Sequence, residues 1–272
     1  MRLGNAVLDD CLCDPAAPLG RDPARCFDLD KVQAQVQLAS LKDWLRVQQT
    51  MLWANQRDAL LLVLQGPDCS GKNGVIRRVL AGLDPLGLAP HSFQAPSEEE
   101  RHHDFLWRYR TRLPAPGMLG IFNRSYYETL VSDLRDGLCT PADIPPRQAA
   151  IEAFEHQLPA SGIRPLKCYL QLSVDEQKKR LHRRLEQPEK RWKLTLGDLH
   201  DHRHFAEQQA QWAEVLCHSH SDAAPWYVIP ADHRWLRDLL AASLLAREFE
   251  RLALEWPTRP APFSHADLDS TP

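Results

Sequence analysis

Short apolar runs alternate with helical stretches along the middle of the chain. The runs are residues 60–64, 118–122, 166–172 and 226–229, and residues 92–94 are a weaker strand candidate. Apolar runs of this length that are bounded by Gly, Pro or Asn are typical of buried strands. Strands that alternate with helices favour an α/β fold, in which a mostly parallel sheet is covered by helices on both faces.

The predicted helices lie before, between and after these strands. Apolar residues recur at helical spacing over residues 30–55, which predicts a long amphipathic helix that serves as a scaffold or a subunit contact. Helices are also predicted over 73–83, 98–112 and 233–254. The sequence Ser-Val-Asp-Glu at 173–176 has the pattern of a capping box, so another helix is expected to begin there.

The length of 272 residues is sufficient for one large domain with a complete core. We expect a loosely ordered N-terminal arm over residues 1–29, one domain over 30–255 and a Pro-rich tail over 256–272. The sequence has no signal-peptide pattern, and its apolar runs are too short to span a bilayer. Seven cysteines without a C-x-x-C pair favour a reduced setting. We therefore expect a cytoplasmic protein without a membrane partner.

Residues 66–72, Gly-Pro-Asp-Cys-Ser-Gly-Lys, match the G-x-x-x-x-G-K pattern of a phosphate-binding loop. The small residues let the backbone wrap around an anion, and the lysine and the following helix N-terminus add positive charge. The pattern alone is not specific. Its position between a predicted strand and a predicted helix favours phosphate binding at Gly66, Gly71 and Lys72.

The expected metal ligand after the lysine is missing, because Asn73 replaces the usual Ser or Thr. Asp68 could bind magnesium instead, since this ion is commonly held by one or two carboxylates and phosphate oxygens. Asp68 could also be only a turn-forming residue after Pro67. We favour the metal role, because an uncompensated carboxylate would repel a bound phosphate. Asn123 is the second candidate, since many P-loop enzymes carry a metal-linked Asp after this strand.

A basic run follows the third main strand. Residues 178–193 contain eight basic and two acidic residues, in a chain whose total charge is −3. Such a run is often only a solvated helix face. This one lies beside a predicted helix start, where P-loop kinases have a mobile lid, and so we predict a helical lid over about residues 174–200. A lid this basic suits a ligand with more phosphates than a mononucleotide has.

These segments together resemble the polyphosphate kinase type 2 family over about residues 30–255. The phosphate loop is unspecific by itself, whereas the last two motifs and the His-Asp-Phe motif are highly specific. The motifs are GPDCSGKNG (66–74), SFQAPS (92–97), HDFLWR (103–108), IFNRSYYE (121–128), EKRWKL (189–194) and APWYVIPADHRW (224–235).

The resemblance implies a P-loop kinase fold with a helical lid, and phosphoryl transfer between inorganic polyphosphate and a nucleotide (AMP, ADP or ATP). It also implies Mg²⁺ as cofactor and a homo-oligomer, a dimer or a tetramer. The implied catalytic residues are Asp68, Lys72 and Arg124. Candidates for nucleotide or polyphosphate binding are Gly66, Gly71, Lys72, Asn73, Gly74, Arg77, Arg78, Arg124, Arg180, Arg184, Arg191, Lys193 and Asp232.

Two positions depart from the family pattern. Many members have Asp where Asn123 stands, and the Asn branch resembles members that accept both AMP and ADP. Tyr126 stands where His or Trp is frequent. The preferred acceptor therefore stays open among AMP, ADP and a guanine nucleotide.

Two rival functions remain. An ATP-dependent nucleoside monophosphate kinase would share the architecture but take its phosphate from ATP. A nucleic-acid-binding module would use the basic run of residues 178–193 to bind backbone phosphates. We expect no nucleic-acid partner, because that run contains only Trp192 as an aromatic residue and a binding module leaves the phosphate loop unexplained.

Overall fold

The computed structural model describes residues 3–258 and 260–270, and it confirms the α/β fold. Its five-stranded sheet has the order β2-β3-β1-β4-β5, and all neighbouring strands are parallel. Because β1 is central, the loop that follows it lies in the middle of the carboxyl edge, where open α/β sheets bind ligands. The strands are β1 (Ala59–Gln65), β2 (Leu88–Ser92), β3 (Leu119–Asn123), β4 (Ile163–Gln171) and β5 (Trp226–Pro230).

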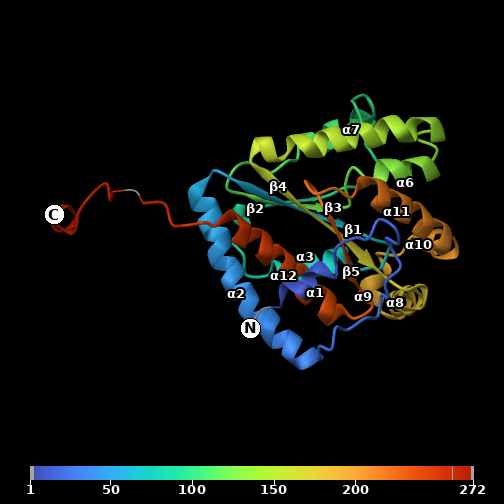
Figure 1. Ribbon diagram of the computed structural model, residues 1–272, viewed down its shortest axis with the longest axis horizontal. Helices are drawn as coiled ribbons and strands as arrows, with labels where there is room; N and C mark the ends of the chain where they lie inside the picture. The colour runs from blue at the N-terminus through green and yellow to red at the C-terminus, as the bar shows by residue number, and fades with distance from the viewer. Residues whose placement is uncertain (1–2, 259, 271–272) are drawn as a thin grey trace.

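Helices cover both faces of the sheet (Figure 1). The first layer is α1 (Asn5–Asp9), α2 (Lys31–Asn55), α3 (Lys72–Val79) and α12 (Arg234–Leu252). The second layer is α6 (Glu128–Arg135), α7 (Ile144–Gln157) and α11 (Phe205–Ser219). The remaining helices are α4 (Glu98–Arg101), α5 (Trp107–Arg110), α8 (Val174–Glu186), α9 (Pro188–Arg191), α10 (Leu196–Arg203), α13 (His265–Asp269) and the 3₁₀ turns η1 (Pro85–Gly87), η2 (Pro141–Asp143) and η3 (Pro159–Ser161).

The central strand shows why the apolar runs have no polar alternation. Every residue of β1 is buried. Leu60 and Leu62 pack toward α2 and α12, whereas Leu61 and Val63 pack toward α6 and α7. A strand between two helical layers needs apolar side chains on both faces. Full burial of each leucine stabilises the fold by about 2 kcal/mol relative to exposure.

Two predicted elements differ from the structure. The weak strand candidate at residues 92–94 is placed too far toward the C-terminus, because β2 ends at Ser92. This strand includes Pro90, which lacks a backbone N–H. A proline is tolerated there because β2 is an edge strand. The single helix predicted over 98–112 is wrong: α4 and α5 are separated by a turn in which the Asp104 carboxylate accepts from the backbone N–H of Leu106 at 3.0 Å.

The N-terminal segment packs against the domain, and the expectation of a loosely ordered arm is wrong for residues 3–29. Leu8 and Cys11 are buried in the core. Leu12 forms an antiparallel bridge with Tyr227. The segment thereby covers the outer edge of β5, which would otherwise present unpaired backbone groups. Few apolar residues carry this contact, so its sequence pattern is weak.

The C-terminal tail behaves differently from the N-terminal segment. Its described residues, 256–258 and 260–270, are exposed, and α13 is the one helix described within them. In Figure 1 this part of the chain runs away from the domain. In the described part of the chain, no helix has both the length and the apolar character that crossing a membrane requires.

Candidate active site

The loop between β1 and α3 folds tightly around a point in front of the α3 N-terminus. Gly66, Cys69 and Gly71 have positive φ angles of 139°, 68° and 103°. A Cβ at Gly66 would lie 2.6 Å from the carbonyl oxygen of Leu170, and a Cβ at Gly71 would lie 1.9 Å from the Arg237 guanidinium. Both positions therefore require glycine. Consecutive backbone turns of this kind are typical of loops that present several N–H groups to one anion.

Two buried arginines hold the outer side of this phosphate loop. Arg180 of α8 donates to the carbonyl oxygens of Cys69 (3.0 Å) and Ser70 (3.2 Å). Arg237 of α12 donates to the same Ser70 oxygen at 2.8 Å. Burial lowers the pKa of Arg237 to about 10, so its guanidinium stays protonated near neutral pH. Because these carbonyls turn toward the arginines, the loop amides remain available on the opposite side.

The place of Arg180 differs from the predicted lid contact. Its side chain is only 4% exposed, and it also donates to two carbonyls after β5 (2.7 and 2.8 Å) and to Glu176 (2.7 Å). Every nitrogen of its guanidinium thus binds protein groups. We interpret Arg180 as a clamp that joins α8, the phosphate loop and the end of β5.

Replacing Arg180 with methionine is expected to lower the free energy of unfolding by about 3 kcal/mol or more, because buried carbonyls and Glu176 lose their donor. Urea unfolding followed by circular dichroism measures this change. Arg183→Met is the matched control on the same helix, since Arg183 lines the cavity described below, and its unfolding midpoint should stay near wild type. Equal midpoints for the two variants would contradict the clamp.

Three charged side chains meet at the phosphate loop. The Lys72 Nζ donates to the carbonyl oxygens of Gly66 (2.6 Å) and Pro67 (3.2 Å). Arg124, directly after β3, donates to the Asp68 carboxylate at 2.9 Å. Burial alone raises the pKa of Asp68, but the charges of Lys72 and Arg124 outweigh burial and lower it below its ordinary value. The Asp68 carboxylate is therefore ionised at neutral pH.

Asn123 and Asn73 face each other beside this group. The Asn123 amide donates to the Asn73 side-chain oxygen and, at 3.0 Å, to the Ser92 hydroxyl. Its own oxygen is buried without a hydrogen-bond partner. Among the described residues there is no cluster of three or more His, Cys, Asp or Glu that could hold a metal. One carboxylate and one unpartnered amide oxygen nevertheless fit Mg²⁺, which takes its remaining ligands from phosphates and water.

A basic cavity of about 290 Å³ opens beside the phosphate loop, between α3, α8, α9 and the start of α12. Nine of its lining residues are Arg or Lys, and none is acidic. The predicted residues that line it are Gly71, Asn73, Gly74, Arg77, Arg78, Arg180, Arg184 and Lys193. The sequence reasoning missed Arg183, Lys190, Arg234 and Arg237.

A signal for the missed residues exists in the sequence. Arg183 and Lys190 belong to the basic run that we assigned to the lid. Arg234 and Arg237 are three residues apart at the start of the helix after β5, and this spacing places both side chains on one helix face at the carboxyl edge. The sequence therefore indicates the helix face on which these residues lie, but not which of them line a cavity.

A second cavity, of about 150 Å³, lies on the other side of Arg124. The aromatic rings of Phe93 and Tyr109 contribute to its lining, and so do Arg108 and Asp133. Arg124 lines this cavity and pairs with Asp68, whose neighbour Cys69 lines the basic cavity. The Asp68–Arg124 pair therefore stands between the two spaces.

Two predicted ligand residues, Asp232 and Arg191, bind other groups of the protein. Both oxygens of the Asp232 carboxylate accept from Ser173, one from its backbone N–H at 2.9 Å and one from its hydroxyl at 2.6 Å. Arg191 donates to the carbonyl of Leu185 at 2.7 Å and does not line the basic cavity. Asp232 thus fixes the start of α8.

The same contact explains why the predicted capping box is only half formed. The Ser173 hydroxyl accepts from the Glu176 N–H at 3.2 Å as expected, but the Ser173 N–H is used by Asp232. The Glu176 carboxylate instead accepts from Arg180 at 2.7 Å.

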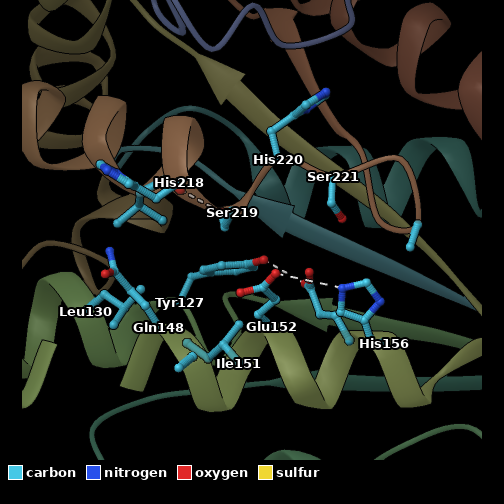
Figure 2. A pocket seen from close by; sticks show the side chains of 14 residues that line it. Tyr127, Leu130, Gln148, Ile151, Glu152, His156, His218, Ser219, His220 and Ser221 are labelled. Carbon is cyan, nitrogen blue, oxygen red and sulfur yellow. Dashed lines mark hydrogen bonds and ion pairs between the residues drawn. The ribbon is translucent and has the colours of Figure 1, made fainter. Parts of the chain in front are cut away.

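A third cavity lies away from the phosphate loop, between α7 and the end of α11 (Figure 2). It measures about 250 Å³. In Figure 2 the ring of Tyr127 lies at its centre, with Glu152 and His156 of α7 on one side and His218 and Ser219 on the other. None of its lining residues lines the basic cavity.

Comparison with known proteins agrees with this geometry. Residues 28–254 match the model of the family Polyphosphate kinase 2 (PPK2). The chain belongs to the polyphosphate kinase 2 family. It is 38% identical over 236 residues to an AMP/ADP-polyphosphate phosphotransferase of Meiothermus ruber, with 87% of this chain and 88% of the relative covered.

Further relatives extend the match. The chain is 37% identical to an ADP-polyphosphate phosphotransferase of Rhodopseudomonas palustris, with 78% of each chain covered. It is also similar to the crystal structure of Polyphosphate Kinase 2 from Arthrobacter aurescens TC1, at 33% identity and a TM-score of 0.87, over 95% of this chain and 96% of that one. This member of the polyphosphate kinase 2 family is therefore a phosphotransferase with the predicted P-loop kinase fold.

Proposed function

We propose that this kinase transfers the terminal phosphoryl group of inorganic polyphosphate to ADP, AMP or both, reversibly and with Mg²⁺. The observation that carries the proposal is the cavity beside the phosphate loop, with nine cationic residues and no acidic residue among its lining. Four of the nine also pair with carboxylates outside the lining, namely Arg78, Arg180, Arg184 and Arg237. ATP presents three phosphates, whereas polyphosphate presents a long row of anions that can neutralise many cations. The names of the relatives from Meiothermus ruber and Rhodopseudomonas palustris support a nucleotide acceptor.

The two cavities suit the two substrates. Polyphosphate is assigned to the basic cavity, and the nucleotide to the cavity on the other side of Arg124, whose lining includes the aromatic residues Phe93 and Tyr109. Arg124 and Asp68 lie between them. Transfer would therefore take place at this pair, with the donor phosphate held by the loop amides.

Catalysis in this site consists of positioning and charge stabilisation. The acceptor phosphate oxygen is already ionised near neutral pH, so no general base is required. Lys72 can exchange the neutral carbonyls of Gly66 and Pro67 for anionic phosphate oxygens. Arg124 neutralises charge on the transferring group, and a closing lid of α8 to α10 excludes water and suppresses hydrolysis.

Asp68 and the unpartnered oxygen of Asn123 would hold the magnesium ion. When bound there, Mg²⁺ would supply positive charge that polarises phosphate oxygens. The Asp68 carboxylate suits this role because Lys72 and Arg124 keep it ionised. The thiol of Cys69 has no part, since burial raises its pKa to about 11 and it stays protonated.

One assay tests the proposal against its rivals. The pure protein is incubated with long-chain polyphosphate, Mg²⁺ and either AMP, ADP or GDP, without ATP. We expect ADP to gain a phosphate, AMP to gain one, or both. Phosphate gain by AMP only after ATP is added would instead support a nucleoside monophosphate kinase. No transfer with either donor, together with salt-sensitive binding of DNA or RNA, would favour a nucleic-acid-binding module.

A homo-oligomer and a cytoplasmic location belong to the same proposal. All seven cysteines are described and are free thiols, which supports a reducing compartment. Val32 and Val36 of α2 are 70% and 66% exposed, and they support α2 as a subunit contact. Light scattering of the purified protein distinguishes a monomer from a dimer or a tetramer.

A further inference from the structure

Four buried side chains form a hydrogen-bond network behind the turn that carries Arg124, and its lysine, Lys167, also donates to the Ser219 carbonyl at 2.9 Å. One oxygen of Glu155, on α7, accepts from the hydroxyls of Tyr126 and Tyr127, both at 2.6 Å. The other oxygen accepts from the Lys167 Nζ, on β4, at 2.8 Å. Lys167 also donates to the Tyr127 hydroxyl at 2.7 Å. The two tyrosines and Lys167 are 0% exposed and Glu155 is 4% exposed.

Stability of the core alone does not account for this network, because burying its charges costs desolvation free energy. A buried ion pair is weak evidence for stability, because desolvation of both charges opposes their attraction. Burial lowers the pKa of Lys167, and the Glu155 carboxylate acts against that shift. Neither Glu155 nor Lys167 lines the basic cavity or the cavity on the far side of Arg124. The role of the Glu155–Lys167 pair must therefore lie in the segment of the chain that it holds in place.

What the pair holds is the turn directly after β3. Tyr126 and Tyr127 follow Arg124 by two and three residues. Arg124 has a φ of 64°, a left-handed conformation that is costly for a residue with a Cβ and persists only where the surroundings enforce it. On the upstream side, the Arg124 N–H donates to the Leu64 carbonyl at 3.0 Å. On the downstream side, the two tyrosines hold the chain.

The hydroxyls of Tyr126 and Tyr127 stay protonated and act as hydrogen-bond donors. Burial and the neighbouring Glu155 carboxylate raise the pKa of both phenols, so each hydroxyl keeps its proton. The Tyr126 ring packs edge-on against Phe154 at 5.2 Å, and the Tyr127 ring lies 4.9 Å from Trp226. Figure 2 shows the Tyr127 ring in the third cavity, whose lining includes no residue of the phosphate loop. The hydroxyls therefore tie the turn to α7 and β4.

We propose that Glu155 and Lys167 are positioning residues for Arg124: their buried pair fixes Tyr126 and Tyr127, and thereby the strained turn that directs the Arg124 guanidinium to Asp68. This inference rests on the proposed function of Arg124. It also gives a role to Tyr126, one of the two positions at which the sequence departs from the family pattern.

The test uses changes that leave the rings and the volume in place. Tyr127→Phe removes one hydroxyl, and Glu155→Gln removes one charge. Each is expected to lower kcat by about 10- to 100-fold, as small misplacements of a catalytic group do. The KM values for polyphosphate and nucleotide should stay within about twofold of wild type, because no residue of either cavity changes.

Tyr169→Phe is the matched control. Tyr169 is also 0% exposed and lies on β4, but its hydroxyl donates to Gln209 at 3.2 Å and not to the network. Its kcat should remain close to wild type. A similar loss of kcat in Tyr169→Phe and Tyr127→Phe would overturn the proposal, because it would show a general effect of losing a buried hydroxyl.

A double-mutant cycle separates positioning from a purely structural role. If Glu155 acts through Arg124, then Glu155→Gln should change kcat by less than about twofold when Arg124 is already alanine. Equal losses in the presence and absence of Arg124 would overturn the proposal. Wild-type activity is measured first with polyphosphate and with ATP, so a wrong donor is recognised independently, and the cycle is run with the active donor.

A crystal structure of Glu155→Gln provides a readout that needs no activity. The 2.9 Å contact between Arg124 and Asp68 is expected to be lost or lengthened in the variant and kept in Tyr169→Phe. An unchanged contact together with an unchanged kcat would overturn the proposal. If Glu155→Gln fails to fold, the same comparison is made with Tyr127→Phe, which removes no charge.

Discussion

Replacing Lys72 with methionine is expected to lower the rate of polyphosphate-dependent transfer by about two to four orders of magnitude. Methionine keeps an unbranched side chain that is one atom shorter, and it removes the ammonium group that binds the carbonyls of Gly66 and Pro67. The transferring phosphoryl group would then lose a fixed positive charge inside the loop. The measurement is kcat and kcat/KM for ATP formation from ADP and polyphosphate.

The control for this change is Lys42→Met, which removes a lysine of α2 that lines none of the described cavities. It should leave the rate unchanged. Circular dichroism should show both variants folded, since the Lys72 ammonium binds only two loop carbonyls in the protein alone. A Lys72→Met enzyme with more than about a tenth of wild-type kcat would contradict the role of the lysine.

Replacing Arg124 with alanine is expected to have an effect of similar size, about two to four orders of magnitude in kcat. Arg124 lines the proposed nucleotide cavity and binds Asp68 at the boundary with the basic cavity. Its loss removes a donor from the transferring group and leaves the Asp68 charge less compensated. Steady-state rates with saturating polyphosphate and nucleotide isolate the loss in kcat from any change in KM.

Arg57→Ala is the matched control for Arg124→Ala. Arg57 is exposed and precedes the amino end of β1, at the edge of the sheet opposite to the phosphate loop. Its replacement should leave kcat and KM near wild type. Near-normal turnover of Arg124→Ala with polyphosphate would mean that the role assigned to Arg124 is wrong, whatever the outcome for Lys72.

Both predictions depend on hydrogen-bond donors and positive charges that are already in position before the substrates bind. Arg180 and Arg237 hold the outer carbonyls of the phosphate loop, so the loop does not need to reorganise when an anion arrives. Donors that are already oriented stabilise a transition state more than donors that must first turn. The clamp and the pair of Asp68 and Arg124 thus contribute to the same function from opposite sides of the loop.

The fold was largely predictable from local patterns. The continuous apolar runs identified four of the five strands, because a strand covered on both faces is composed mainly of apolar residues. The edge strand β2 was misplaced, since Pro90 is acceptable only where one side of a strand is unpaired. The packed N-terminal segment was also missed, because a few buried contacts such as Leu8 and Cys11 leave no periodic pattern.

The candidate site was predictable in part. The glycines of the phosphate loop and Lys72 are spaced by backbone requirements within seven residues, so they can be read from sequence. The roles of Arg180 and Asp232 could not be read in this way, because both are polar residues at the carboxyl edge and only their partners distinguish a ligand contact from a clamp. Arg237 was missed because it meets the loop from α12.

The sequence by itself determined the elements and chemistry that depend on neighbouring residues: apolar strands, helix starts, the phosphate loop and the basic run. Tertiary structure alone decided which charged side chains face the cavities and which are paired with groups inside the protein. It also decided that Glu155 and Lys167 meet behind Arg124. The physical reason is that the role of a charged side chain depends on the group that it contacts. The contacting groups come from strands and helices far apart in the chain.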